Sequence, residues 1–235
     1  MTDISRSPAR IAGMFDAIAS RYDFLNHLLS AGIDRRWRRA AIRSLELTGS
    51  ERVLDLCTGT ADLAIAARVA SPRAARVVGV DFAGAMLRVG RDKLLHGGMA
   101  DRITLVRGDA SRVPVATASV DAVTVAFGIR NVERTADACA EMCRVLKPGG
   151  RLAILEFAIP PTPIIRSAYL WYFHHVLPRI GRLVARHQAY EYLPASVGAF
   201  QTPQEFVTLL RQSGFSDIRT RPLTCGIVYL YTARR

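Results

Sequence analysis

Short apolar runs alternate with helix-like segments along the chain from about residue 50 onwards. The runs that indicate buried strands lie at 52–57, 76–80, 103–107, 120–126 and 151–157. Helical spacing of apolar positions occurs between them, at 61–70, 83–95 and 133–146, and Lys147-Pro148-Gly149-Gly150 is expected to end the last helix. This alternation predicts a doubly wound, mostly parallel sheet of the α/β class. Ligands of such sheets bind at the carboxyl ends of the strands, where strand order reverses.

The two ends of the chain depart from this alternation. Residues 1–48 have a helical pattern and many arginines. We expect them to form an N-terminal helical cap over the active site, at the strand ends where ligands of such sheets bind. Residues 49–235 are expected to form the main domain, with an aromatic and basic insertion at about 158–200. The pattern then predicts a helix at 203–213 and two strands at 218–222 and 227–232, whose short link fits an antiparallel pair.

The charge balance is strongly basic. The chain carries 32 Lys and Arg against 20 Asp and Glu, a net charge of +12, and Lys93 and Lys147 are its only lysines. Such a surface attracts polyanions such as nucleic acid, anionic lipid or acidic metabolites, although an arginine-rich composition that simply solvates the surface is an equal alternative.

The cysteine pattern points to a reducing compartment, and the apolar stretches are too short for a membrane span. Cys57, Cys139, Cys143 and Cys225 have neither metal-ligand spacing nor the density of a disulfide scaffold, so we expect no metal. No stretch approaches the roughly 18 apolar residues of a membrane span, and the N-terminus lacks an apolar leader. We therefore expect a cytoplasmic protein that is soluble or peripherally bound to a membrane.

Small and acidic residues follow three of the predicted strands. After the first strand, a turn at Gly59 and Thr60 lets a ligand approach the N–H groups of a helix N-terminus, although a tight turn needs no ligand. Asp81 ends the second strand, where a carboxylate can accept both ribose hydroxyls or, alternatively, cap the next helix. Asp109 and Ala110 follow the third strand, where an acceptor for an adenine amino group would lie. Together these residues predict a nucleoside site.

The turn after the first strand lacks the G-x-G-x-x-G pattern with which a dinucleotide oxidoreductase binds pyrophosphate. S-adenosylmethionine is a nucleoside without phosphate, so a single glycine, Gly59, and an orienting carboxylate, Asp55, suffice for it. The residues therefore favour an S-adenosylmethionine site over a dinucleotide site.

Three longer motifs make the interpretation specific. They are Tyr22–Ser30 followed by Trp37, Phe127–Val132, and Arg144–Leu152 continuing to Glu156-Phe157. With them the chain is similar, over about residues 14–233, to the ubiquinone/menaquinone biosynthesis C-methyltransferase family. The resemblance implies a Rossmann-like class I methyltransferase fold, with a seven-stranded sheet whose last strand is antiparallel. It also implies cofactor contacts at Thr60, Asp81, Asp109, Ala110 and Ala126.

Some positions depart from the family pattern. Asp34 stands where the motif usually has histidine, Ala158 where it usually has serine, and Thr58 and Ala61 replace glycines of the cofactor turn. These departures concern the choice of substrate and the affinity for the cofactor. They leave the class of enzyme unchanged.

The resemblance implies methyl transfer to a ring carbon of a polyprenylated quinol. Arg130 would stabilise the phenolate that develops on the ring, or would form a salt bridge that fixes its loop. Asn131 would orient the substrate oxygen. Tyr22 and His27 lie on the N-terminal segment expected to close over the pocket, and His27 is a candidate base or an ordinary surface histidine. Whether the ring is a benzoquinol or a naphthoquinol stays open.

A lipid tail would need an apolar exit. The segment 164–187 combines Trp171, Tyr172 and Phe173 with Arg179, Arg182 and Arg186, which is typical of an interfacial surface, although a helix packed on the sheet edge is equally compatible. We expect contact with anionic lipid on the inner face of the membrane, and a homodimer is a further possibility.

Two rival functions remain at this level. A nucleic-acid methyltransferase would need a D/N-P-P-aromatic loop or a cysteine after a proline, and neither is present, so we expect no nucleic-acid partner. A non-catalytic nucleoside-binding or scaffold protein would keep Asp81 and lack a usable Arg130–Asn131 site.

Overall fold

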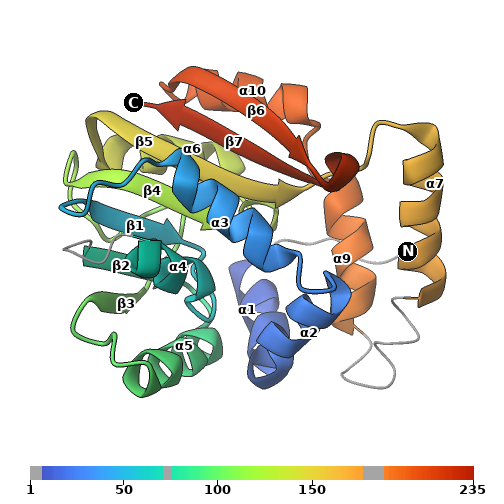
Figure 1. The fold of residues 1–235 in the computed structure, drawn as a ribbon, viewed down its shortest axis with the longest axis horizontal. Coiled ribbons are helices and arrows are strands. Elements are labelled where there is room, and N and C mark those ends of the chain that lie inside the picture. The colour runs from blue at the N-terminus through green and yellow to red at the C-terminus, as the bar shows by residue number, and fades with distance from the viewer. Residues whose placement is uncertain (1–6, 71–75, 177–187) are drawn as a thin grey trace.

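The computed structural model describes residues 7–70, 76–176 and 188–235. Within them lies a seven-stranded sheet with the order β3-β2-β1-β4-β5-β7-β6 (Figure 1). The strands are β1 (Arg52–Leu56), β2 (Arg76–Asp81), β3 (Ile103–Arg107), β4 (Val120–Ala126), β5 (Leu146–Phe157), β6 (Ser216–Leu223) and β7 (Val228–Arg234). β1 pairs in parallel with β2 and β4, and the strand order therefore reverses between β1 and β4.

The antiparallel part of the sheet lies at one edge. β7 runs antiparallel to both β5 and β6, and the short turn Thr224–Gly226 joins the last two strands. The predicted fold class is therefore confirmed: a mostly parallel, doubly wound sheet with a reversed last strand.

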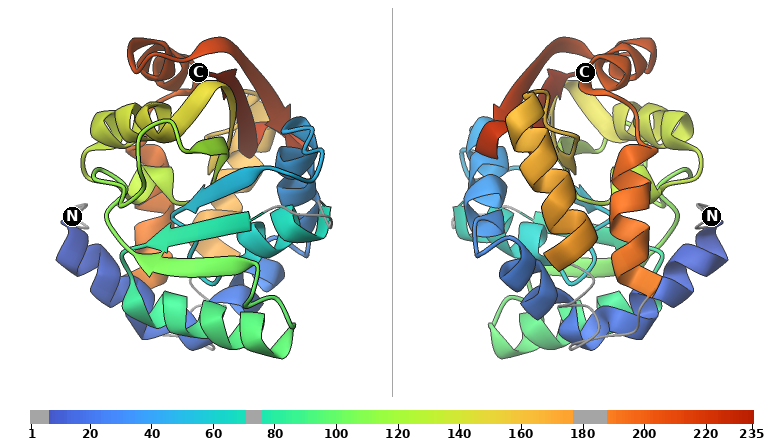
Figure 2. Two further views of the ribbon diagram at one scale, coloured as in Figure 1. Left: turned by 90° about the vertical axis from the view of Figure 1, so that its left-hand side faces the viewer. Right: turned by 90° about the vertical axis from the view of Figure 1, so that its right-hand side faces the viewer.

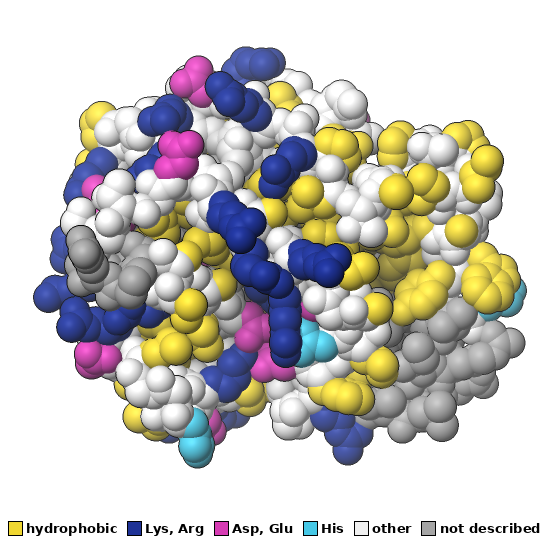
Figure 3. Space-filling view, in the orientation of Figure 1, with side chains coloured by type: hydrophobic (Ala, Val, Ile, Leu, Met, Phe, Trp, Pro, Cys, Tyr) yellow, Lys and Arg dark blue, Asp and Glu magenta, His cyan; other side chains and the backbone are white. Residues whose placement is uncertain are grey.

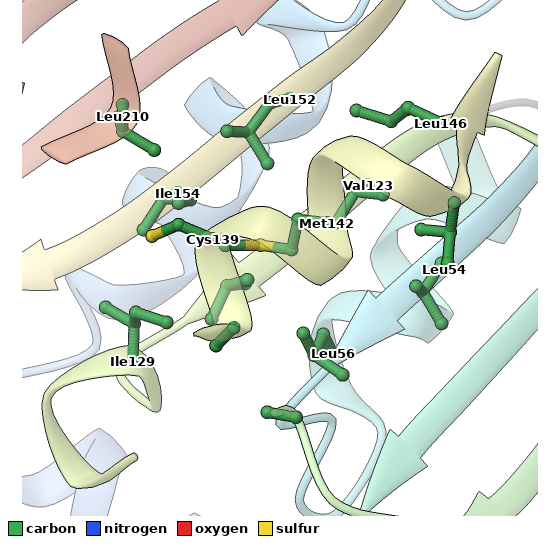
Figure 4. Close-up of a cluster of buried hydrophobic side chains, with 14 of the residues drawn as sticks. Leu54, Leu56, Val123, Ile129, Cys139, Met142, Leu146, Leu152, Ile154 and Leu210 are labelled. Atoms are coloured by element: carbon green, nitrogen blue, oxygen red, sulfur yellow. The ribbon is translucent and has the colours of Figure 1, made fainter. Parts of the chain in front are cut away.

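Helices cover both faces because the strand side chains alternate between them. On one face, Leu54 and Leu56 of β1 belong to one buried cluster with Met142 of α6 (Thr135–Val145) and Leu210 of α10 (Pro203–Gln212), and Figure 4 shows part of this cluster. On the other face, Val53 packs with the helices α3 (Asp34–Ser44), α4 (Asp62–Ala70) and α5 (Gly84–His96).

The remaining helices gather at the carboxyl ends of the parallel strands (Figures 1 and 2). They are α1 (Pro8–Ile18), α2 (Tyr22–Leu29), α7 (Pro163–Trp171) with the π-helical turn η3 (Tyr172–Val176), and α9 (Gln188–Gly198). α1 and α2, which begin the predicted cap, thus lie where ligands of such sheets bind, whereas α3 packs on the sheet itself. No helix of the described residues is long and apolar enough to cross a membrane.

The sequence placed the elements correctly but missed details at their ends. Lys147–Gly150, expected only to end a helix, belongs to β5, which begins at Leu146. The register between β4 and β5 is irregular at this point, and Gly149 adopts a φ of +75°, so the strand accommodates the glycines in a local distortion. Arg179, Arg182 and Arg186 of the predicted interfacial segment lie outside the described residues.

Candidate active site

The turn after β1 is built on a buried carboxylate. Oδ2 of Asp55 accepts a hydrogen bond from Oγ1 of Thr58 at 2.5 Å, and Oδ1 accepts one from Oγ1 of Thr124 at 2.8 Å. Burial raises the pKa of Asp55 to about 6. Asp55 therefore lies beneath the turn and fixes its shape, and its side chain does not line the cleft above.

Asp81 holds the same turn from the end of β2. Its Oδ2 accepts from the backbone N–H of Gly59 and its Oδ1 from the N–H of Ala83, each at 2.8 Å. The carboxylate is buried, which raises its pKa. Asp81 thus bonds the N–H of Ala83, the residue just before α5, although this helix has no side-chain cap in the strict sense. It also lines a narrow cleft with Gly59 and Ala126.

The other predicted cofactor residues do not line this cleft. Oγ1 of Thr60 donates to Oδ1 of Asp23 on α2, at 2.5 Å. Asp109 is exposed and accepts hydrogen bonds from the backbone N–H and hydroxyl of Ser111, each at 2.8 Å. Ala110 is part of the hydrophobic core. The structure thus brings Gly59, Asp81 and Ala126 together at the cleft.

A second and much larger cavity of about 440 Å³ adjoins the cleft. Its walls come from α1, α2, α3, α7, η3 and α9 and are mostly apolar and aromatic. Trp37 contacts Phe127 and Phe157 edge to face, at ring-centroid distances of 5.9 and 6.1 Å, and the two phenylalanines stack at 4.5 Å. A cavity of this size and lining is typical of a site for an apolar ring with few polar groups.

The cleft and the cavity share a wall. Phe15, Tyr22 and Phe127 line both of them. Three residues after Phe127, Arg130 lines the large cavity, and the next residue, Asn131, lines the cleft. Two ligands bound in these spaces would therefore meet at the end of β4, beneath Tyr22.

Arg130 is buried and makes a dense set of contacts. Its Nη1 donates to Oε1 of Glu156 at 2.7 Å and to the carbonyl oxygen of Phe127 at 2.6 Å, and its Nε donates to Oγ of Ser196 at 3.3 Å. The guanidinium also lies over the ring of Phe157, 5.4 Å from its centroid. Arg130 thus makes the salt bridge that was considered as the alternative to a catalytic role. Its side chain also lines the cavity.

Asn131 and Tyr22 complete the shared wall. Oδ1 of Asn131 accepts a hydrogen bond from the hydroxyl of Tyr192 on α9 at 3.1 Å, which fixes the amide. Burial raises the pKa of Tyr22, against the opposing effects of a hydrogen bond with Asn26 and the positive charge of Arg130. Tyr22 is therefore a neutral hydrogen-bonding group at neutral pH.

The structure does not bring His27 to the cavity. Its Nδ1 lies 2.9 Å from Oδ2 of Asp34, whose other oxygen accepts from the hydroxyl of Ser30 at 2.9 Å. Asp34 also pairs with Arg38, one turn further along α3. Asp34, at the position where the family motif usually has histidine, thus joins α2 to α3.

A chain of charges ties the N-terminal helices to the cofactor turn. Nη2 of Arg38 lies 3.3 Å from Oδ2 of Asp62 at the start of α4. Lys93 on α5 donates to both Asp62 and Asp23, at 2.5 and 2.8 Å. Asp23 also accepts from Thr60, so the position of α2 is coupled directly to the turn that faces the cleft.

Sequence reasoning gave no role to several residues of this site. Glu156 is fully buried at the end of β5 and balances Arg130. An acidic residue at the carboxyl end of a parallel strand is the signal that identified Asp81, and it applies equally to Glu156. Trp37, Phe157 and Tyr169 line the cavity, but no local pattern distinguishes such aromatics from ordinary core residues.

Comparison with known proteins agrees with this geometry. Residues 3–235 match the profile of the ubiE/COQ5 methyltransferase family. A protein of Syntrophotalea carbinolica named ubiquinone/menaquinone biosynthesis C-methyltransferase UbiE is 51% identical over 94% of this chain and 92% of its own length. The demethylmenaquinone methyltransferase of Deinococcus radiodurans is 46% identical over 93% of this chain and 89% of its own. The chain belongs to the ubiE/COQ5 methyltransferase family.

Membership of the ubiE/COQ5 family confirms the resemblance predicted from the motifs and makes this protein a methyltransferase. It gives no support to the scaffold or nucleic-acid alternatives. Solved structures add evidence for the fold alone. The [4+2]-cyclase SpnF matches with a TM-score of 0.72 at 16% identity over 97% of each chain. A SAM-dependent methyltransferase from Aquifex aeolicus matches with a TM-score of 0.62 at 15% identity, over 84% of this chain and 88% of its own.

Proposed function

We propose that this protein transfers a methyl group from S-adenosylmethionine to a ring carbon of a demethylated polyprenyl quinol. One observation carries the proposal: the narrow cleft at Asp81 and the apolar cavity meet at the wall formed by Tyr22 and Phe127, with Arg130 and Asn131 on its two sides. The names of the relatives, which are quinone-biosynthesis methyltransferases, support the same substrate class.

The residues at the cleft fit the cofactor. Asp81 uses one lone pair on each oxygen for a backbone N–H, which leaves acceptor positions for two ribose hydroxyls. Phe82 and Met86 give the cleft an apolar side against which an adenine can pack. The cleft lies where the strand order reverses, between β1 and β4, as expected for a nucleoside in this fold.

S-adenosylmethionine supplies a methyl group that its sulfonium already activates, so the protein has to position the quinol and stabilise its phenolate form. The aromatic floor of Trp37, Phe127 and Phe157 supports the flat ring. Nη2 of Arg130 has no hydrogen-bond partner among the described residues and is the donor available to a ring oxygen. Glu156 holds the guanidinium in place. Asn131, fixed by Tyr192, orients the reactants from the cleft side.

We propose that the protein works in the cytoplasm, on the inner face of the membrane that holds its substrate. The polyprenyl tail leaves the cavity between α2 and α7, which expose large apolar side chains, namely Phe24 at 59%, Ile164 at 82% and Trp171 at 59%. On the same face of the molecule, Figure 3 shows basic side chains gathered over α3 beside the apolar surface of α7. The exposed arginines of α3 are Arg35, Arg36, Arg39 and Arg43.

This combination supports binding to anionic lipid, because apolar side chains enter the headgroup region while arginines pair with phosphates. A homodimer that buries the same side chains of α7 is the competing arrangement. Sedimentation of the protein with and without vesicles separates the two, since a dimer would persist in their absence.

A transfer assay with methyl-labelled cofactor tests the function. Short-tailed demethylated naphthoquinol and benzoquinol are offered in parallel with RNA and DNA, and we expect label only in a quinol. Label in nucleic acid, or in none of the acceptors, would contradict the proposal. The relative rates with the two quinols then identify the ring. In cells that lack the protein, the quinone that accumulates should be missing one methyl group.

A further inference from the structure

The hydroxyl of Tyr169 is a buried polar group without a partner. Tyr169 lies on α7, has only 8% of its surface exposed, and lines the large cavity. Its ring is held by Phe173, whose centroid is 4.3 Å away at an interplanar angle of 72°, and by Leu25 of α2. Among the described residues no atom makes a hydrogen bond with its hydroxyl.

Such a group is costly to the protein, because burial removes the hydrogen bonds that water would provide. A phenylalanine at this position would keep the packing against Phe173 and avoid the cost. The hydroxyl therefore indicates a partner that arrives from the cavity, since the rest of the ring is enclosed by apolar side chains.

The charges around the cavity indicate which kind of hydrogen-bond partner suits the hydroxyl of Tyr169. Burial raises the pKa of Tyr169 well above its usual value, the positive charge of Arg130 lowers it, and the negative charge of Glu156 raises it further. The phenol is therefore a neutral donor at physiological pH, and it lines the same cavity as Arg130. A donor and a cation that line one cavity suit an oxygen that carries or develops negative charge.

We propose that Tyr169 donates a hydrogen bond to a ring oxygen of the quinol and, with Arg130, favours its phenolate form. This inference rests on the proposed function and adds a substrate contact from α7 to it. It also gives the insertion that contains α7 a part in recognising the ring, beside any part in membrane binding.

The experiment compares the wild type with Tyr169→Phe, which removes one oxygen atom. We expect kcat/KM for the quinol to fall on the order of 10- to 100-fold, as for loss of a hydrogen bond to a charged group. We expect the acid limb of the pH profile of kcat/KM to move to higher pH in the variant, because the phenolate form of the quinol is less favoured there. Thermal stability without substrate should stay the same or rise. Tyr229→Phe, on β7 and outside the cavity lining, is the matched control and should leave the rate unchanged.

Two outcomes would overturn the inference. One is a rate for Tyr169→Phe within twofold of wild type, and the other is a marked loss of thermal stability, which would reveal a partner inside the protein. Equilibrium binding of a short-tailed quinone provides a readout that needs no turnover. If the wild type binds the quinone but does not methylate the quinol, the proposed function fails. The ratio of the dissociation constants of the wild type and Tyr169→Phe for the quinone still decides the role of Tyr169.

Discussion

Nη1 of Arg130 lies 2.7 Å from Oε1 of Glu156, and both side chains are buried at the carboxyl ends of the adjacent strands β4 and β5. Glu156 also accepts hydrogen bonds from the backbone N–H groups of Arg130 and Phe157, at 3.2 and 2.8 Å. The ion pair therefore fixes the loop between the two ligand spaces. A role of Arg130 in chemistry must be separated from this structural role.

Replacement of Arg130 alone should affect stability as well as rate. Arg130→Ala leaves the carboxylate of Glu156 buried without its cation, which typically costs about 3–5 kcal/mol. In the double variant Arg130→Met with Glu156→Gln no buried charge remains, and most of that stability should return. Its kcat should nevertheless stay on the order of 10²-fold below wild type, because the donor to the developing phenolate is missing. Single-turnover methylation measures the rate of methyl transfer, and thermal melting measures the stability of each variant.

The comparison for this prediction is Glu156→Gln alone, which keeps one acceptor oxygen where the carboxylate uses two and leaves Arg130 buried without its anion. It should therefore lose stability while Arg130 stays in the cavity wall. A double variant that melts like wild type and also methylates at the wild-type rate would make Arg130 purely structural. Tyr22 would then be the next residue to test, because it lies on the same wall.

Asp81 should determine the affinity for the cofactor. Asp81→Asn keeps the shape of the side chain but loses the charge and one acceptor, and a hydrogen bond to a charged group is worth about 1.5–3 kcal/mol. We expect the affinity for S-adenosylmethionine to fall roughly tenfold or more by calorimetry. Asp101→Asn, at an exposed carboxylate that pairs with Arg102, is the control. Equal affinities in the three folded proteins would refute the ribose assignment.

The buried carboxyl of Asp55 should make stability depend on pH. Burial raises its pKa from 3.8 to about 6, so the folded state holds this proton more tightly than the unfolded state. The contribution of Asp55 is therefore most favourable below about pH 4 and is lost as the pH rises through 6, by up to about 3 kcal/mol. Asp55→Asn removes this dependence, because an amide does not titrate in this range.

Urea unfolding of both proteins between pH 4 and 7 tests this sign. Relative to wild type, Asp55→Asn should gain stability as the pH rises through this interval. The difference between the two proteins isolates Asp55 from other groups, such as Glu51, whose backbone hydrogen bonds hold its pKa down at about 2. A constant difference across the interval would contradict the raised pKa.

The basic side chains of α3 should provide the electrostatic part of membrane binding. Each arginine near an anionic surface contributes about 1 kcal/mol, so replacing Arg36, Arg39 and Arg43 by glutamine should weaken binding to anionic vesicles on the order of 10²-fold. Wild-type binding should decrease with salt and be weak on neutral vesicles. Vesicle cosedimentation measures all of these.

The charge-matched control replaces three exposed arginines outside α3, Arg91, Arg112 and Arg211, by glutamine. If both triple variants lose binding equally, net charge rather than the position of α3 is responsible. Trp171→Ser tests the apolar part, and it should weaken binding to neutral and anionic vesicles by the same factor. Salt-insensitive binding of the wild type would contradict an electrostatic contribution of α3 to membrane binding.

The sequence by itself determined the layers of the fold and the class of enzyme. Alternating apolar runs specify which segments become buried strands, and the right-handed crossover rule then leaves few topologies. Asp81 was identifiable because carboxyl ends of parallel strands meet at one edge of a sheet, so position along a strand predicts position in the site. The family motifs around Tyr22 and Phe127 added the chemistry.

Only the tertiary structure decided how those residues are used. Glu156 lies 26 residues beyond Arg130, and their pairing depends on the adjacency of β4 and β5. His27 carries the chemistry of a base, but the position of α3 brings it to Asp34 instead of the cavity. Tyr169 comes from the insertion, where no periodic pattern relates it to Arg130. Sequence periodicity encodes which face of an element is buried, whereas contacts between distant segments depend on how the elements pack, and the active site consists of such contacts.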